Sequence, residues 1–273
     1  MVASAVMSTN AAPARGSPRA TTIEARRVSK TYGTYRTGGG ADGVQALHEV
    51  DFGVREQEFV SILGPSGCGK STLLRAIAGL TPFDGAISVS GEQVRGPMDD
   101  VGVVFQSANL LPWRTVEANL RLGIEIRRET PEPGRLKAML EMIGLTGFES
   151  RYPHELSGGM RQRVAIGQAL VRNPKVLLLD EPFGALDALT RDKLNIELLR
   201  IWQAEKKTVV LVTHSIPEAI LLSDRVLVMS ERPGRLLEDV HIDLPRPRDP
   251  KTTRASADFG KYVVRLGELM GLE

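Results

Sequence analysis

The sequence predicts an α/β fold built around a mostly parallel sheet. Short runs of consecutive apolar residues, many of them β-branched, recur along the chain, and the segments between them carry helical spacing. Apolar side chains at successive positions, rather than at alternate ones, indicate strands that helices bury on both faces. The four runs lie at residues 59–63, 101–105, 176–179 and 209–212.

A polar or backbone-exposing residue follows each predicted strand directly. These residues are Gly64, Gln106, Asp180 with Glu181, and Thr213 with His214. Open α/β sheets bind ligands at the carboxyl ends of their parallel strands. Taken alone, Gln106 and His214 are ordinary polar strand ends, so the motifs that accompany them decide whether this edge is a site.

A helical segment interrupts the pattern of strands between residues 107 and 165, approximately. Within it Leu136, Leu140 and Ile143 are spaced by four and three residues, Pro133 stands near the start, and Gly144 stands just past the end. Proline at the start and glycine after the end are typical helix boundaries. We expect a helical subdomain inserted into the sheet domain.

Two segments flank this domain, which we expect to span residues 23–244. Residues 1–22, rich in Ala, Ser, Pro and Arg, predict a disordered tail, with an organelle transit peptide as the alternative. Residues 245–273 predict a Pro- and Arg-rich linker and then a short amphipathic helix. The apolar side of that helix, expected to pack on the body rather than on a partner, carries Phe259, Val263, Leu266 and Met270.

The composition excludes several classes of protein. With 35 Lys and Arg against 33 Asp and Glu, the formal net charge of the 273 residues is +2, so nothing indicates nucleic acid as a partner. The single cysteine, Cys68, excludes an intrachain disulfide and fits a reducing compartment. The longest apolar runs are about five residues, whereas a membrane-spanning helix needs about 20. We expect a chain that does not cross a bilayer.

The stretch GPSGCGKST has the G-x-x-x-x-G-K-[ST] pattern of a phosphate-binding loop, directly after a predicted strand and before a predicted helix. In such a loop backbone N–H groups surround phosphates, Lys70 reaches the β- and γ-phosphate oxygens, and Ser71 ligates Mg²⁺. Cys68 occupies a free position, where we expect a spectator open to alkylation. The predicted nucleotide-binding residues are Gly64, Pro65, Ser66, Gly67, Cys68, Gly69, Lys70, Ser71 and Thr72.

Two adjacent carboxylates end the predicted strand in VLLLDEP. We assign Asp180 to the metal and Glu181 to the general base that takes a proton from the attacking water. On its own such a pair often only caps a helix, but the phosphate loop in the same chain favours the catalytic interpretation.

A second potential phosphate-binding element is Ser157-Gly158-Gly159, which precedes another helical run in HELSGGMRQRVAIGQAL. It serves the same triphosphate as the phosphate loop only if the fold brings the two together; otherwise it serves the nucleotide of another subunit.

The order of these motifs over about residues 23–244 resembles the ATP-binding cassette family of transporter ATPases. The set comprises the phosphate loop, a glutamine after a strand, the LSGG element, the DE pair, ALD and a strand-end histidine. The resemblance implies a P-loop NTPase core with an antiparallel β part near the N-terminus, with ATP and Mg²⁺ as cofactors. It also implies a head-to-tail dimer, with each ATP between one phosphate loop and the partner's LSGG element.

The resemblance also implies roles for individual residues. Tyr32 stacks on adenine, with Tyr35 as the fallback, and Gln106 contacts Mg²⁺ and the attacking water. Ser157 and Gly159 contact the partner's γ-phosphate. Two further residues complete the set, Asp187 along the dimer interface and His214 hydrogen-bonded to the γ-phosphate.

Three positions depart from the family pattern, at Met160, at Gly167 with Gln168, and at Ser215. None removes a phosphate contact. Gly167 inside a helix is expected to cost about 0.5–1 kcal/mol relative to alanine.

Segments such as FQSANLLPWRTVEANL and DEPFGALDALTR resemble importers of the nitrate, sulfonate and taurine type. In those, an ATPase dimer lies at the cytoplasmic face of the membrane beneath two permease subunits, which a substrate-binding protein supplies. Leu110, Leu111 and Trp113 fall where the family docks a permease helix, although core packing explains Trp113 equally well. The alternative is a soluble cassette of the Fe–S assembly type. In such importers the permease and the binding protein, rather than the ATPase, recognise the transported substrate.

Overall fold

A six-stranded sheet forms the centre of the computed structural model, which describes residues 20–33, 43–130, 132–184 and 186–272. Five strands are parallel, and β10 at one edge is antiparallel to its neighbour β9. The predicted α/β fold is confirmed, and β9 is a parallel strand that the sequence analysis did not assign. In spatial order the strands are β10 (Leu236–His241), β9 (Arg225–Met229), β3 (Phe59–Leu63), β8 (Thr208–Thr213), β7 (Val176–Asp180) and β6 (Val101–Val104).

A second, antiparallel sheet lies near the N-terminus, as the family resemblance implied. It contains β2 (Gly43–Arg55), β1 (Thr21–Gly33), β4 (Asp84–Val89) and β5 (Glu92–Gln93) in that order. Strand β1 begins ahead of the domain boundary expected at residue 23. Residues 1–19 of the expected tail, and Tyr35, lie outside the described residues.

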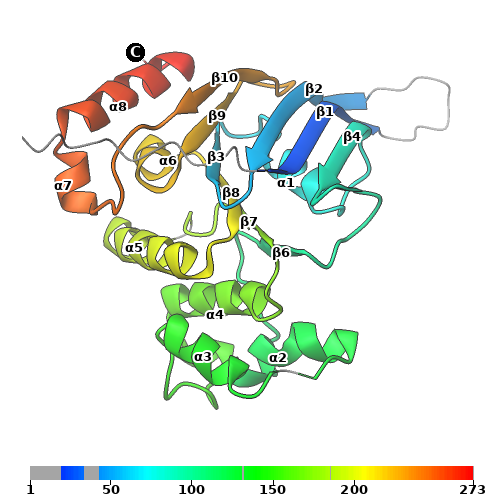
Figure 1. The fold of residues 1–273 in the computed structure, drawn as a ribbon, viewed down its shortest axis with the longest axis vertical. Coiled ribbons are helices and arrows are strands. Elements are labelled where there is room, and N and C mark those ends of the chain that lie inside the picture. The colour runs from blue at the N-terminus through cyan, green and yellow to red at the C-terminus, as the bar shows by residue number, and fades with distance from the viewer. Residues whose placement is uncertain (1–19, 34–42, 131, 185, 273) are drawn as a thin grey trace, which may run out of the picture.

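Helix α1 (Lys70–Ile77) packs between the two sheets (Figure 1). Its buried Leu73, Leu74 and Ile77 share one core with Val60 and Ile62 of β3 and with residues of the antiparallel sheet. Phe59 and Leu63, at alternate positions of β3, belong to two other cores on the opposite side of the central sheet. This alternation is what a strand buried on both faces requires, and it fixes the start of α1 directly beyond the end of β3.

A helical subdomain follows β6 and lies below the central sheet in Figure 1, as expected. Its core includes Leu120, Met139, Leu140 and Ile143, which are all buried. It comprises α2 (Val116–Arg127), α3 (Arg135–Met142), the 3₁₀ helix η1 (Pro153–Glu155) and α4 (Gly158–Leu170), and α5 (Ala188–Glu205) packs against α4.

Gly167 lies where α4 crosses α2 and α3. A Cβ added there would lie 2.8 Å from Leu120 Cδ2 and 3.1 Å from Ile143 Cδ1. Glycine therefore allows the helices a closer approach than alanine does, and this packing offsets the intrinsic helical cost of the residue.

The C-terminal segment is part of the fold. Helix α8 (Ala257–Leu269) is the amphipathic helix that the sequence predicted, and its buried Phe259 and Leu266 pack on α6 (Ile216–Leu222) and the adjoining strands. The short helix α7 (Pro250–Arg254) is held to α5 by an ion pair between Arg254 and Asp192 at 2.7 Å.

Arg248 anchors the linker that leads to these helices. Its side chain is buried, and burial lowers the pKa of the guanidinium to about 10. Its nitrogens donate to five carbonyl oxygens, several of them at the end of α6, where carbonyls lack helical partners. The acceptors are Ile220, Leu221, Ser223, Ile242 and Leu244 at 2.6–3.4 Å.

Replacing Arg248 by alanine leaves these carbonyls without their donor. We expect Arg248→Ala to lower the free energy of unfolding by roughly 2–4 kcal/mol, measured by urea denaturation. Arg265→Ala on α8 removes an exposed arginine that pairs with Glu238 on β10, and it should cost no more than about 0.5 kcal/mol. Equal effects of the two substitutions would contradict the anchoring role of Arg248.

Candidate nucleotide-binding and catalytic site

The predicted phosphate loop connects β3 to α1 and closes on itself around one lysine. Lys70 is only 4% exposed, and its Nζ donates to the carbonyls of Gly64 at 2.9 Å and Pro65 at 2.8 Å. Gly67 and Gly69 adopt positive φ angles of 77° and 105°, which favour glycine. A Cβ at Gly69 would lie 2.6 Å from the Ala46 carbonyl. The loop therefore has the backbone conformation and the buried cation that a phosphate cradle requires.

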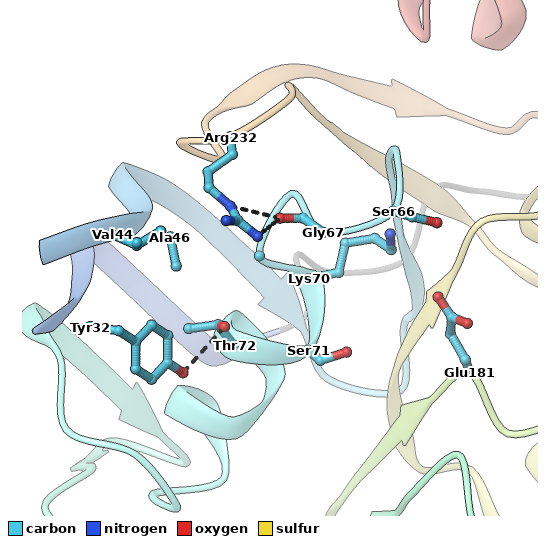
Figure 2. Close-up of a pocket in the computed structure, with 11 residues that line it drawn as sticks. Tyr32, Val44, Ala46, Ser66, Gly67, Lys70, Ser71, Thr72, Glu181 and Arg232 are labelled. Carbon is cyan, nitrogen blue, oxygen red and sulfur yellow. Dashed lines mark hydrogen bonds between the residues drawn. The ribbon is translucent and has the colours of Figure 1, made fainter. Parts of the chain in front are cut away.

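A cavity of about 430 Å³ opens beside this loop (Figure 2). Tyr32 forms one side of it, is 43% exposed, and shares a hydrogen bond of 3.3 Å with Thr72 Oγ1. An aromatic face open to a cavity next to a phosphate loop can stack on a base. The lining residues are Tyr32, Val44, Ala46, Ser66, Gly67, Gly69, Lys70, Ser71, Thr72, Glu181 and Arg232.

The first carboxylate of the DE pair meets the phosphate loop. Ser71 Oγ donates to Asp180 Oδ1 at 2.6 Å, joining the start of α1 to the end of β7. A hydroxyl and a carboxylate oxygen at this separation suit Mg²⁺, which binds few protein oxygens and completes its shell with water and phosphate. The described residues contain no cluster of three His, Cys, Asp or Glu side chains that could hold a metal ion.

The second carboxylate, Glu181, meets the strand-end histidine. His214 Nδ1 lies 3.2 Å from Glu181 Oε2, and the glutamate backbone has a positive φ of 42°. That angle is uncommon for a non-glycine residue. A Cβ added to Gly184 would lie 3.4 Å from Glu181 Oε2 and 3.6 Å from Gln106 Nε2. Gln106, Glu181 and His214 therefore gather at one edge of the sheet.

The LSGG element lies elsewhere. Ser157 is the exposed N-cap of α4 and accepts a hydrogen bond from Met160 N at 3.2 Å. The structure describes all three residues of the element, Ser157, Gly158 and Gly159, and none of them lines the cavity beside the phosphate loop. A Cβ at Gly159 would lie 3.2 Å from Thr190 on α5. The phosphate loop and the LSGG element of one chain therefore do not line a single pocket.

Asp187 caps α5 close to this second element. Its side chain accepts from Thr190 N at 3.0 Å. Hydrogen bonding from the Thr190 side chain, and then from its N–H, holds the pKa of the carboxyl below its usual range. Trp113 is 71% exposed, so the core-packing interpretation of this residue is wrong.

Cys68 is buried, and burial raises the pKa of its thiol, so the expected openness to alkylation is contradicted.

The structure adds two residues that the sequence analysis missed. Arg232, from the turn after β9, reaches the phosphate loop. Glu218 is buried on α6, burial raises its pKa, and Thr213, the residue before His214, donates its hydroxyl proton to it. No local sequence signal marks either residue, because Arg232 lies in a turn and Glu218 lies on α6, a helix that was not predicted.

Comparison with known proteins agrees with this geometry. A family model described as ABC transporter matches residues 47–184. The chain is 46% identical to the aliphatic sulfonates import ATP-binding protein of Bacillus cereus, covering 84% of this chain and 91% of that protein. It is 48% identical to the taurine import ATP-binding protein of Rhizobium johnstonii, covering 80% and 86%. A solved dimeric ATP-binding cassette in a post-hydrolysis state, with ADP and phosphate bound, covers 82% of this chain and 100% of its own at TM-score 0.68 and 33% identity. The chain therefore belongs to the ABC transporter family, as one of its ATP-binding cassettes.

Proposed function

We propose that this chain is the ATP-hydrolysing subunit of an importer that takes up a small solute of the nitrate, sulfonate and taurine class. The observation that carries the proposal is the division of its phosphate-binding groups between a cavity at the phosphate loop and a separate, exposed LSGG element. Such a chain completes its site only with another copy. The sulfonate and taurine import relatives support the transport class.

Within one cavity, the residues divide the work of binding. Tyr32 stacks on the adenine, and the loop N–H groups and Lys70 hold the phosphates. Asp180 does not line the cavity, but it accepts a hydrogen bond from Ser71, which does. Ser71 Oγ, Asp180 and the Gln106 amide would hold Mg²⁺, which neutralises phosphate charge when bound.

Hydrolysis depends on the second carboxylate. Glu181 accepts a proton from the attacking water while the new bond to the γ-phosphorus forms and the bond to the bridging oxygen breaks, giving ADP and phosphate. His214 lies 3.2 Å from the Glu181 carboxylate, so it holds that group in place and stands beside the γ-phosphate. The Thr213 hydroxyl donates to Glu218 and accepts from the Ser215 N–H, so these contacts hold the backbone on both sides of His214.

Two copies pack head-to-tail in this proposal, and Ser157 and Gly159 of each face the γ-phosphate held by the other. Asp187, beside the same element, runs along the interface. The exposed Trp113, with Leu110 and Leu111, faces one of two transmembrane permease subunits, which a substrate-binding protein supplies. The ATPase dimer is then peripheral, at the cytoplasmic face of the membrane. None of the described helices is long and apolar enough to span a bilayer.

The base assignment predicts the behaviour of Glu181→Gln. This variant keeps the loop and Lys70, so ATP binding should be retained, while hydrolysis should fall at least about 100-fold because the proton acceptor is lost. Phosphate release measures turnover, and size-exclusion chromatography with ATP should show a trapped dimer. Glu141→Gln, an exposed carboxylate on α3, is the control. Turnover near the wild-type rate in Glu181→Gln would move the base role to another group.

The phosphate loop assignment predicts the behaviour of Lys70→Ala. Loss of a buried cation facing the β- and γ-phosphates should weaken ATP binding by about 1.5–3 kcal/mol, roughly 10- to 150-fold. Isothermal titration calorimetry measures the affinity, with the exposed Lys137→Ala on α3 as the control. Unchanged affinity in Lys70→Ala would place the nucleotide elsewhere.

The role of the LSGG element in the partner's site is tested best at Ser157. Because Asp and Asn cap helices as well as Ser does, Ser157→Asp adds a charge against the γ-phosphate with little effect on the fold, and Ser157→Asn is its uncharged control. A substitution at Gly159 would also disturb packing on α5. We expect Ser157→Asp to lose hydrolysis and Ser157→Asn to retain more of it, while monomers of both still bind ATP.

A mixed dimer separates the two possible geometries. When Ser157→Asp is paired with Lys70→Ala, a head-to-tail dimer places both lesions in one site and leaves the other site intact. One trapped ATP per dimer is expected in a filter-binding assay. Damage to both sites would show that the LSGG element acts on the nucleotide of its own chain.

A further inference from the structure

Arg232 reaches the phosphate loop from a distant part of the sequence. It lies in the turn between β9 and β10, 165 residues after Gly67. Its Nε and Nη2 both donate to the Gly67 carbonyl, at 3.2 and 3.0 Å (Figure 2). The side chain also lines the cavity that contains Tyr32 and Lys70. A second cation therefore stands at the mouth of the nucleotide pocket.

The turn that carries Arg232 is fixed against the loop. Gly234 N donates to the Ala46 carbonyl at 2.9 Å, and His48 N donates to the Gly234 carbonyl at 3.0 Å. A Cβ at Gly234 would lie 2.1 Å from the Cys68 carbonyl, so only glycine permits this approach. The backbone from which Arg232 extends is held by β2 and by the loop that its side chain contacts.

The charge of Arg232 is not neutralised within the described part of the chain. There, no carboxylate oxygen lies within 4.0 Å of its guanidinium, whose hydrogen bonds both end on a neutral carbonyl. Arginines elsewhere in the fold, such as Arg225 and Arg254, pair with carboxylates. A guanidinium has five donors in a planar fork that suits phosphate oxygens, and Arg232 uses only part of them.

Holding the Gly67 carbonyl also fixes the next N–H group. In a trans peptide the C=O and N–H bonds point in opposite directions. With the carbonyl held toward Arg232, the Cys68 N–H points back into the loop, where it lies 3.4 Å from the Pro65 carbonyl. Arg232 thus fixes the orientation of a peptide that faces the hollow of the loop.

We propose that Arg232 is a nucleotide-binding residue, which orients the Gly67–Cys68 peptide and places its charge against the phosphate chain of the bound nucleotide. The proposal rests on nucleotide binding at the phosphate loop, and it adds a contact from the turn after β9. Because the turn and the loop are joined, binding of the phosphate chain is coupled to the β9–β10 edge of the sheet.

The test compares nucleotides that differ only in their phosphates. In the full chain, Arg232→Ala should raise the Kd for ATP and ADP about tenfold, while the Kd for adenosine stays within about twofold. Arg235 lies in the same turn but does not line the cavity. Arg235→Ala removes an equal charge and should leave all three affinities unchanged. Titration calorimetry at two salt concentrations measures them, and circular dichroism verifies that the variants fold.

Two further variants separate charge from loop orientation. Arg232→Lys keeps the charge and should retain more ATP affinity than Arg232→Gln, which keeps a donor for the Gly67 carbonyl but loses the charge. Full affinity in Arg232→Gln, or an unchanged ATP affinity in Arg232→Ala, would overturn the direct phosphate contact. An equal loss of affinity for adenosine would also overturn it. If the wild-type chain itself bound no ATP, the assignment of the nucleotide site would be wrong, and this outcome is distinguishable from the others because it does not depend on Arg232.

Discussion

The parallel pairing of β3, β8, β7 and β6 is the constraint on which the whole site depends. The register places Leu63 opposite Thr213 and Val212 opposite Asp180, so the residues that follow these strands emerge at one edge. Because side chains alternate between the faces of a strand, a slip of one residue in β7 would exchange the directions of Asp180 and Glu181. Strands β3, β7 and β8 are fully buried, which specifies the register strongly and keeps the two carboxylates on different partners.

The LSGG element and the segment that follows Glu181 form one packed unit. A Cβ at Gly158 would lie 3.1 Å from Leu186 and one at Gly159 would lie 3.2 Å from Thr190, so α4 approaches the start of α5 closely. Asp187 lies between those two residues and caps α5. If the helical subdomain moves, the proposed interface residues therefore move with it, and so does the chain that follows Glu181. This packing links the subdomain to the Glu181–His214 pair.

Much of this arrangement was predictable because its signals are local. Four strands, the helical insertion and the phosphate loop follow from runs, spacing and glycines, and the edge they share follows from the parallel topology. Local signals do not identify the partners of the two carboxylates, because the contact between Ser71 and Asp180 joins residues 109 positions apart. Nothing local marks Arg232, whose position depends on where the turn after β9 packs. Gly167 was interpreted as a cost because helix propensity is local, whereas its benefit arises from Leu120 and Ile143 on other helices.

The burial of Cys68 has a practical consequence for spectroscopy. It is the only cysteine of the chain, it is 1% exposed, and burial raises the pKa of its thiol. A thiolate is the species that reacts with maleimides and methanethiosulfonates, so the native thiol competes weakly for such reagents. New cysteines placed on the exposed faces of α3 and α8 can accept fluorophores or spin labels without first altering the phosphate loop. Distances between cassettes can then be followed through a turnover cycle in an otherwise unmodified chain.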